Sequence, residues 1–125
     1  MPVQAGATAE VLLTVTEADT AIAFQSGVVP VLATPRVVAL VEEASCLAIA
    51  DQLADGETSV GMRVQLDHLA PVKVGSKVRA AATLERQDGR RLTFSVSVTD
   101  SSGLVAAGKV TRAVVHVTGF LDKAR

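Results

Sequence analysis

The chain has 125 residues, of which 49% are hydrophobic, and its 12 Lys and Arg against 13 Asp and Glu give a formal net charge of −1. This length predicts a single domain over residues 1–125 with one hydrophobic core. The net charge is close to zero, the basic residues are scattered along the chain, and the only aromatic side chains are three Phe. These features argue against a nucleic-acid or anionic-membrane partner.

The first 30 residues predict a cytoplasmic protein that begins with one strand. The N-terminus has neither the basic nor the apolar stretch of an export signal, and no apolar run in the chain reaches 18 residues. Residues 10–17 are rich in β-branched side chains and predict a strand. Residues 19–30 contain Gly27 and Pro30 without a clear period, which indicates irregular chain or a short helical turn.

A long helix is predicted from Thr34-Pro35 to Asp55-Gly56. Thr is a good N-cap, Pro is favoured at the first helical position, and about 20 residues follow without Gly or Pro. The segment is apolar nearly all round, which indicates burial on most sides. It contains Cys46, the only cysteine, which excludes an intramolecular disulfide and fits a reducing compartment.

Four strands are predicted after the helix, over residues 58–69, 75–87, 90–100 and 103–117. Apolar residues alternate along each strand, and one face of the first holds Val60, Met62, Val64 and Leu66. Hairpin-length connections predict an antiparallel meander, which covers the helix only by curling around it. The predicted fold class is therefore α+β: a hot dog fold, with an antiparallel β-sheet wrapped around one long central α-helix. Its open edges predict a homodimer or a dimer of dimers.

Two adjacent glutamates in the predicted helix point in different directions. Glu43 shares its direction with Arg36, whereas Glu42 lies in line with apolar and small side chains. Because burying an unpaired charge is costly, Glu42 is either a functional carboxylate or a residue that lies at a subunit contact or is semi-exposed. His68 shares strand parity with Leu66 and so faces the helix, where it is either functional or structural.

Thr34 also has two interpretations. As an N-cap its hydroxyl has a structural role, while the free amides of the helix start suit a carbonyl oxygen that gains negative charge. His116 is expected to be structural or exposed. Glu42, His68 and His116 lack the spacing of metal ligands, so no metal site is predicted, and the motifs of serine hydrolases, NTPases and dinucleotide-binding proteins are absent.

With these residues placed, the chain resembles the fluoroacetyl-CoA thioesterase-like branch of the hot dog thioesterase superfamily, from about Val28 to Val117. The resemblance rests on short segments in a fixed order: Leu32-Ala33-Thr34 followed eight residues on by Glu42, then Ser59-Val60-Gly61, Asp67-His68, Asp88–Phe94 and Thr111–Val114. It implies that Thr34, Glu42 and His68 are catalytic. It also implies that Gly61 and Arg112 bind the substrate near the thioester and the CoA.

The reaction implied by the resemblance is hydrolysis of a short or small acyl-CoA thioester to free acid and CoA, with no cofactor beyond the CoA of the substrate. Glu42 would be the nucleophile or the general base, and His68 would transfer protons. Thr34 would position the carboxylate or stabilise the intermediate, and amides near Gly61 would hold the oxyanion.

The resemblance leaves the acyl group and two other functions open. The family's best-known member has gate phenylalanines where this chain has Val28-Val29-Pro30-Val31-Leu32, which argues against fluoroacetyl specificity. One alternative is a non-catalytic acyl-CoA-binding or regulatory module of the same fold. The other, a hot dog dehydratase, is disfavoured because the predicted helix contains no histidine.

Overall fold

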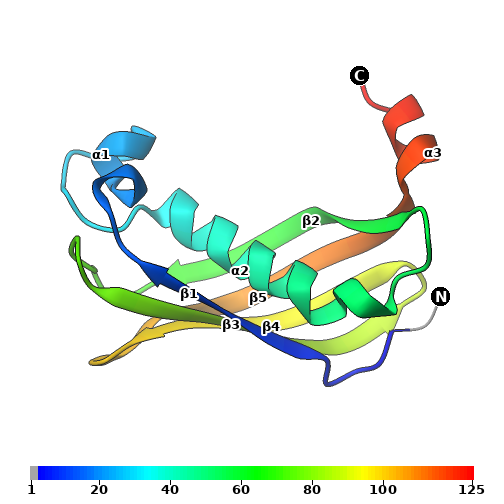
Figure 1. The fold of residues 1–125 in the computed structure, drawn as a ribbon, viewed down its shortest axis with the longest axis horizontal. Coiled ribbons are helices and arrows are strands. Elements are labelled where there is room, and N and C mark those ends of the chain that lie inside the picture. Colours follow the sequence, from blue (N-terminus) through cyan, green and yellow to red (C-terminus); the bar gives the residue numbers. More distant parts are fainter. Residues whose placement is uncertain (1–2) are drawn as a thin grey trace.

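The computed structural model describes residues 3–125 and shows one antiparallel sheet that curls around one long helix (Figure 1). The strands are β1 (Thr8–Thr14), β2 (Glu57–His68), β3 (Lys77–Asp88), β4 (Arg91–Asp100) and β5 (Gly103–His116). The helices are η1 (Glu17–Asp19), α1 (Ala21–Phe24), α2 (Thr34–Ile49), η2 (Ala50–Gln52) and α3 (Val117–Asp122), of which η1 and η2 are 3-10 turns. The predicted strand, central helix and four further strands are confirmed, but α2 ends at Ile49 and the 3-10 turn η2 ends at Gln52, ahead of the predicted end at Asp55-Gly56.

The order of strands across the sheet is β1-β3-β4-β5-β2. Strands β3, β4 and β5 follow one another as predicted, but β2 pairs with β5 and not with β3, so the prediction of a four-stranded meander is wrong. Alternation along a strand identifies its faces but carries no information on which strand lies beside it. As a consequence, β1 and β2 form the two edges of the sheet.

The core lies between α2 and the inner face of the sheet. Alternate apolar residues of β3 and β4 are buried there as predicted, namely Val78, Ala80, Ala82, Leu84, Leu92, Phe94, Val96 and Val98. The helix contributes its own buried set, which includes Val37, Leu40, Val41, Ala44 and Ile49. Each large apolar side chain removed from water stabilises the fold by about 1.5–3 kcal/mol, so this layer holds α2 on the sheet.

The start of α2 is fixed by Asp19. The Nε of Arg36 donates to Asp19 Oδ1 at 2.9 Å, and the Ala33 amide donates to the Asp19 carbonyl at 2.9 Å. Burial raises the pKa of the Asp19 carboxyl, but hydrogen bonds from Thr16 and Arg36 outweigh it and hold the pKa below the ordinary value of 3.8. An ionised Asp19 therefore connects η1 to the first turn of α2.

The helix is less covered than its apolar sequence predicts. It packs chiefly against β1 and β3 and more sparsely against β2 and β5. Leu47 of α2 is 52% exposed and Met62 of β2 is 50% exposed. The prediction of burial on most sides is therefore wrong for a single chain, because an apolar part of α2 and of the β2 edge remains open. None of the helices within residues 3–125 is long and apolar enough to cross a membrane.

Candidate active site

Thr34 and His68 form the first of two groups into which the predicted site residues fall. Thr34 is the first residue of α2, and Ala33 is the N-cap. The Thr34 side chain makes no capping bond, so its predicted N-cap role is wrong; its Oγ1 lies 2.8 Å from Nδ1 of His68, at the end of β2. His68 Nε2 is buried without a partner among the described residues. A substrate atom that enters here meets an imidazole nitrogen with an open hydrogen-bonding position.

Glu42 and Arg112 form the second group. Arg112 Nη1 donates to Glu42 Oε2 at 3.0 Å. The guanidinium is almost completely buried, whereas the Glu42 side chain is 34% exposed. Glu43 is exposed, which confirms the predicted difference in direction, although Glu42 is half-buried and not buried. A half-buried carboxylate beside a fixed cation accepts a charge-assisted hydrogen bond and is still open to solvent.

Gly61 gives the Glu42 carboxylate its space. It pairs with Arg112 across β2 and β5 and lies directly beneath the carboxylate. A Cβ at this position would lie 2.5 Å from Glu42 Oε2 and 3.6 Å from Arg112 Nη1. Real Cβ atoms do not approach an oxygen to 2.5 Å, so any side chain here displaces the carboxylate. Glycine is therefore required by the site and not by a turn.

A β-bulge at Met62 brings these residues to one face. Gly61 pairs with Arg112 and Arg63 pairs with Thr111, which leaves Met62 as an extra residue. Before the bulge Ser59 faces inward and is buried; after it His68 faces α2 and bonds to Thr34. The sequence predicted that Val60 and Met62 share the inner face with Val64. This prediction is wrong for the residues before the bulge, because the extra residue reverses the alternation.

The two groups are separate within one chain. Thr34 and Glu42 are eight residues apart on α2, a rise of about 12 Å along the helix axis. No hydrogen bond or ion pair joins the two groups within residues 3–125. The structure thus assembles Glu42 with Gly61 and Arg112, and Thr34 with His68, but does not place all five residues around one point. His116 is exposed at the end of β5, as expected.

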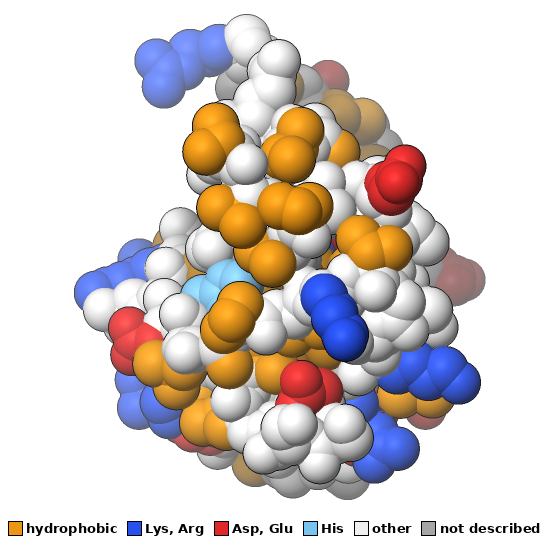
Figure 2. Space-filling model, turned by 90° about the vertical axis from the view of Figure 1, so that its left-hand side faces the viewer, with side chains coloured by type: hydrophobic (Ala, Val, Ile, Leu, Met, Phe, Trp, Pro, Cys, Tyr) orange, Lys and Arg blue, Asp and Glu red, His pale blue; other side chains and the backbone are white. Residues whose placement is uncertain are grey.

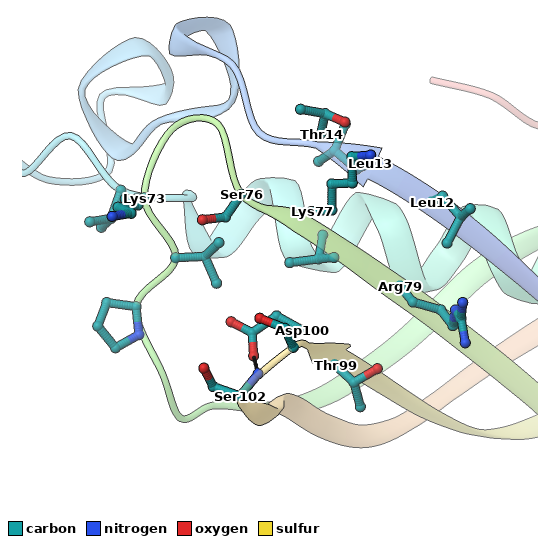
Figure 3. A pocket seen from close by; sticks show the side chains of 15 residues that line it. Leu12, Leu13, Thr14, Lys73, Ser76, Lys77, Arg79, Thr99, Asp100 and Ser102 are labelled. Carbon is teal, nitrogen blue, oxygen red and sulfur yellow. Dashed lines mark hydrogen bonds between the residues drawn. The ribbon is translucent and has the colours of Figure 1, made fainter.

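A cavity lies away from these residues, at the ends of β1 and β3 and the β4–β5 turn (Figure 3). It has a volume of about 1100 Å³ and is lined by apolar residues together with Lys73, Lys77 and Arg79. Asp100 lies at its rim, where its Oδ1 accepts from the Ser102 amide at 2.8 Å (Figure 3). None of the five predicted site residues lines this cavity, so it is a separate feature.

Hydrophobic side chains gather around a histidine on the face at the α1 end of the molecule (Figure 2). Segments at this end contribute exposed apolar residues, namely Ile22, Phe24, Val28, Val29, Leu69 and Val74. Val28, which stands in the segment compared with the gate phenylalanines, is 90% exposed. This end of the molecule is therefore an apolar surface.

Ser59 is the polar residue of the site that sequence reasoning missed. Arg112 Nε donates to Ser59 Oγ at 2.9 Å, and Arg112 Nη2 donates to the Ser59 carbonyl at 2.9 Å. The sequence signal that could have pointed to Ser59 was the odd spacing of seven between Gly61 and His68. This spacing requires a bulge if both residues face the helix, and it then places Ser59 on the same face as Gly61.

No group of three or more His, Cys, Asp or Glu side chains suited to a metal ion occurs in the described part of the chain.

Comparison with known proteins gives concordant results. The family model of the fluoroacetyl-CoA-specific thioesterase matches residues 15–118. The fluoroacetyl-CoA thioesterase of Streptantibioticus cattleyicolor is 37% identical over 95 residues, which cover 76% of this chain and 68% of the relative. The residues matched by the family model include both groups of candidate residues.

Solved structures show the same architecture. The structure of the fluoroacetyl-CoA thioesterase FlK superposes with a TM-score of 0.90 at 29% identity, covering 98% of this chain and 96% of that one. A hot-dog-like protein from Thermanaerovibrio acidaminovorans gives a TM-score of 0.87 at 26% identity, covering 97% and 89%. The predicted hot dog fold is confirmed.

Proposed function

Because the chain belongs to the fluoroacetyl-CoA-specific thioesterase family and is an acyl-CoA thioesterase, we propose that it hydrolyses a short acyl-CoA with Glu42 as the reacting carboxylate. The observation that carries this proposal is the contact of Glu42 with buried Arg112 above a glycine. In the reaction, water supplies OH to the acyl carbon and H to the CoA sulfur. Glu42 either attacks the carbonyl carbon or removes a proton from the attacking water.

Thr34 and His68 are proposed to act on the thioester from the other side. The first amides of α2 suit the carbonyl oxygen, which gains negative charge as the carbon is attacked. The Thr34 hydroxyl donates to Nδ1 of His68 and so leaves the imidazole proton on Nε2. The open Nε2 of His68 suits a proton donor to the leaving sulfur. The apolar surface at the α1 end suits a small acyl group without charge. Gly61 and Arg112 are proposed to shape and hold the carboxylate, with the substrate next to them.

A complete site needs two chains in this proposal. The separation of about 12 Å between the two groups along α2 is too long for one thioester carbon to contact both. Edge strand β2 supplies a row of unpaired backbone groups. Met62 of β2 and Leu47 of α2 supply exposed apolar side chains. We propose a homodimer, or a dimer of such dimers, in which Glu42 of one protomer faces the Thr34–His68 group of its partner.

Subunit complementation tests this arrangement. We expect Glu42→Gln and His68→Asn homodimers each to be inactive. A heterodimer of the two, isolated through different tags, should regain about half of the wild-type turnover, because one of its two sites receives an intact residue from each chain. The measurement is CoA release by heterodimers whose mass is verified by light scattering.

The matched control combines two defects of the same group. A heterodimer of Thr34→Val and His68→Asn should stay as slow as its parents, since every site then contains one damaged partner. Recovery in this control, or no recovery in the first heterodimer, would contradict a site shared between protomers. A monodisperse wild-type monomer at micromolar concentration would contradict the dimer itself.

The activity is tested with a panel of acyl-CoAs and a thiol reagent that detects free CoA. We expect turnover of short acyl-CoAs that is unchanged by exhaustive chelation, because the proposed groups are a carboxylate, an imidazole and a hydroxyl. Turnover of fluoroacetyl-CoA should exceed that of acetyl-CoA only as far as its more electron-poor carbonyl provides, since the segment Val28–Leu32 contains no aromatic gate residue.

Three outcomes of the panel would contradict parts of the proposal. Binding of acyl-CoA without CoA release would indicate a non-catalytic acyl-CoA-binding module. Loss on chelation with recovery on zinc would indicate a metal-dependent site. A preference of several thousandfold for fluoroacetyl-CoA over acetyl-CoA would show that another segment of the chain discriminates between the two acyl groups.

We place the single domain of residues 1–125 in the cytoplasm, in keeping with the free thiol of Cys46.

A further inference from the structure

Arg112 is held by Ser59 on one side and bonds to Glu42 on the other. Its Nε and Nη2 donate to the hydroxyl and the carbonyl of Ser59, both at 2.9 Å. Its Nη1 donates to Glu42 Oε2 at 3.0 Å. Arg112 is 6% exposed and Ser59 is 8% exposed. A single residue of β2 therefore satisfies two donors of a buried cation, and the reacting carboxylate accepts from a third.

The two bonds to Ser59 set the direction of the bond to Glu42. A guanidinium is planar, and its N–H groups have fixed directions relative to one another. Once Nε and Nη2 are bonded to one residue, neither the plane nor its rotation is free. Without the Ser59 hydroxyl, the buried Nε would lose its partner and the group would shift toward a new one. The position of Nη1 would shift with it.

The position of Nη1 matters because Glu42 is held through one oxygen. Oε2 accepts from Arg112, while Oε1 has no hydrogen-bond partner within residues 3–125. A carboxylate fixed at one oxygen presents the other in a constant direction. Reacting groups displaced by about 1 Å can lose about a hundredfold in rate, so a small rotation of the guanidinium is amplified at the reaction.

We propose that Ser59 is a positioning residue of the thioesterase reaction, which fixes Arg112 and thereby directs the free oxygen of Glu42 toward the thioester. This inference rests on the proposed role of Glu42. Ser59 acts through Arg112 and not on the acyl-CoA, so its removal lowers kcat and leaves KM nearly unchanged.

The first test compares three variants of buried hydroxyls. Ser59→Ala should lower kcat about tenfold, with KM for the acyl-CoA within about twofold of wild type, because the Ser59 carbonyl still holds Nη2. Ser59→Thr keeps the hydroxyl and should recover most of the rate. Ser45→Ala is the matched control, since Ser45 is also buried and its hydroxyl donates to the Val41 carbonyl at 2.7 Å within α2 and not to the Glu42–Arg112 pair. Its kcat should stay within about twofold of wild type.

The second test is a double-mutant cycle with Arg112→Met. If Ser59 acts through the guanidinium, Ser59→Ala should change kcat by less than about twofold in the Arg112→Met background. An equal loss in both backgrounds, or a wild-type kcat for Ser59→Ala, would overturn the inference. A wild-type protein that releases no CoA would instead overturn the proposed function, so the two failures are distinguishable in one assay.

Discussion

Glu42→Gln should lower turnover by about a hundredfold or more while the fold and the assembly persist. The amide has nearly the size of the carboxylate, and its oxygen can still accept from Arg112 Nη1, so the packing beside Gly61 is kept. The amide can neither attack a thioester nor remove a proton from water. Steady-state kinetics with a thiol reagent, together with the melting temperature, measures both parts of this expectation.

Glu43→Gln is the matched control one position away. Glu43 is exposed, and the residue in line with it, Arg36, bonds to Asp19 instead. The substitution therefore removes a surface charge whose interactions are worth at most about 1 kcal/mol, and turnover should remain near wild type. Equal rates for the two variants at equal melting temperature would remove Glu42 from the mechanism.

Gly61→Ala should lower kcat about ten- to a hundredfold with little change in stability. The added Cβ would lie 2.5 Å from Glu42 Oε2, so the end of the flexible Glu42 side chain must move and the 3.0 Å bond from Arg112 is lost. The three atoms nearest to this Cβ belong to the side chains of Glu42 and Arg112, so the carboxylate can move while strand β2 keeps its place. Kinetics and thermal unfolding of the same preparation separate the two effects.

Alanine variants of two other glycines serve as controls for Gly61→Ala. Gly119→Ala in α3 has no atom within 4 Å of the new Cβ, so it should leave the rate unchanged and should not lower the stability. Gly108→Ala would drive its Cβ into the backbone of Gln65 across β2 and β5, and should destabilise the fold. A Gly61→Ala protein that behaves like the Gly119 variant would show that the carboxylate does not need its present position. One that unfolds like the Gly108 variant would assign Gly61 to the fold.

The sequence predicted most strands of the sheet and the separation of the two glutamates. Alternation with period two located β2 to β5 within about two residues, because buried and exposed positions differ along each strand. Helical geometry distinguished Glu42 from Glu43 because adjacent helical residues point about 100° apart.

The features that the sequence did not predict all depend on contacts between distant segments. The pairing of β2 with β5 depends on a connection that crosses the end of the sheet, and no local pattern specifies it. Thr34 has the sequence of an N-cap, yet its hydroxyl bonds to a histidine 34 residues away. Ser59 is an ordinary strand residue until Arg112 is placed across the sheet from it.

The extra residue at Met62 also restricts how the length of this segment can change. Gly61 and His68 are on opposite parities, and a single insertion in β2 reconciles them. Loss of this extra residue would remove the bulge, and uninterrupted alternation would then keep the carboxylate support and the imidazole on the same face. Gain of one residue beside the existing bulge would instead turn one of the two to solvent, although the segment would remain a good strand. Among related chains, a spacing of seven between this glycine and this histidine should therefore accompany a bulge, and a spacing of six should accompany a regular strand.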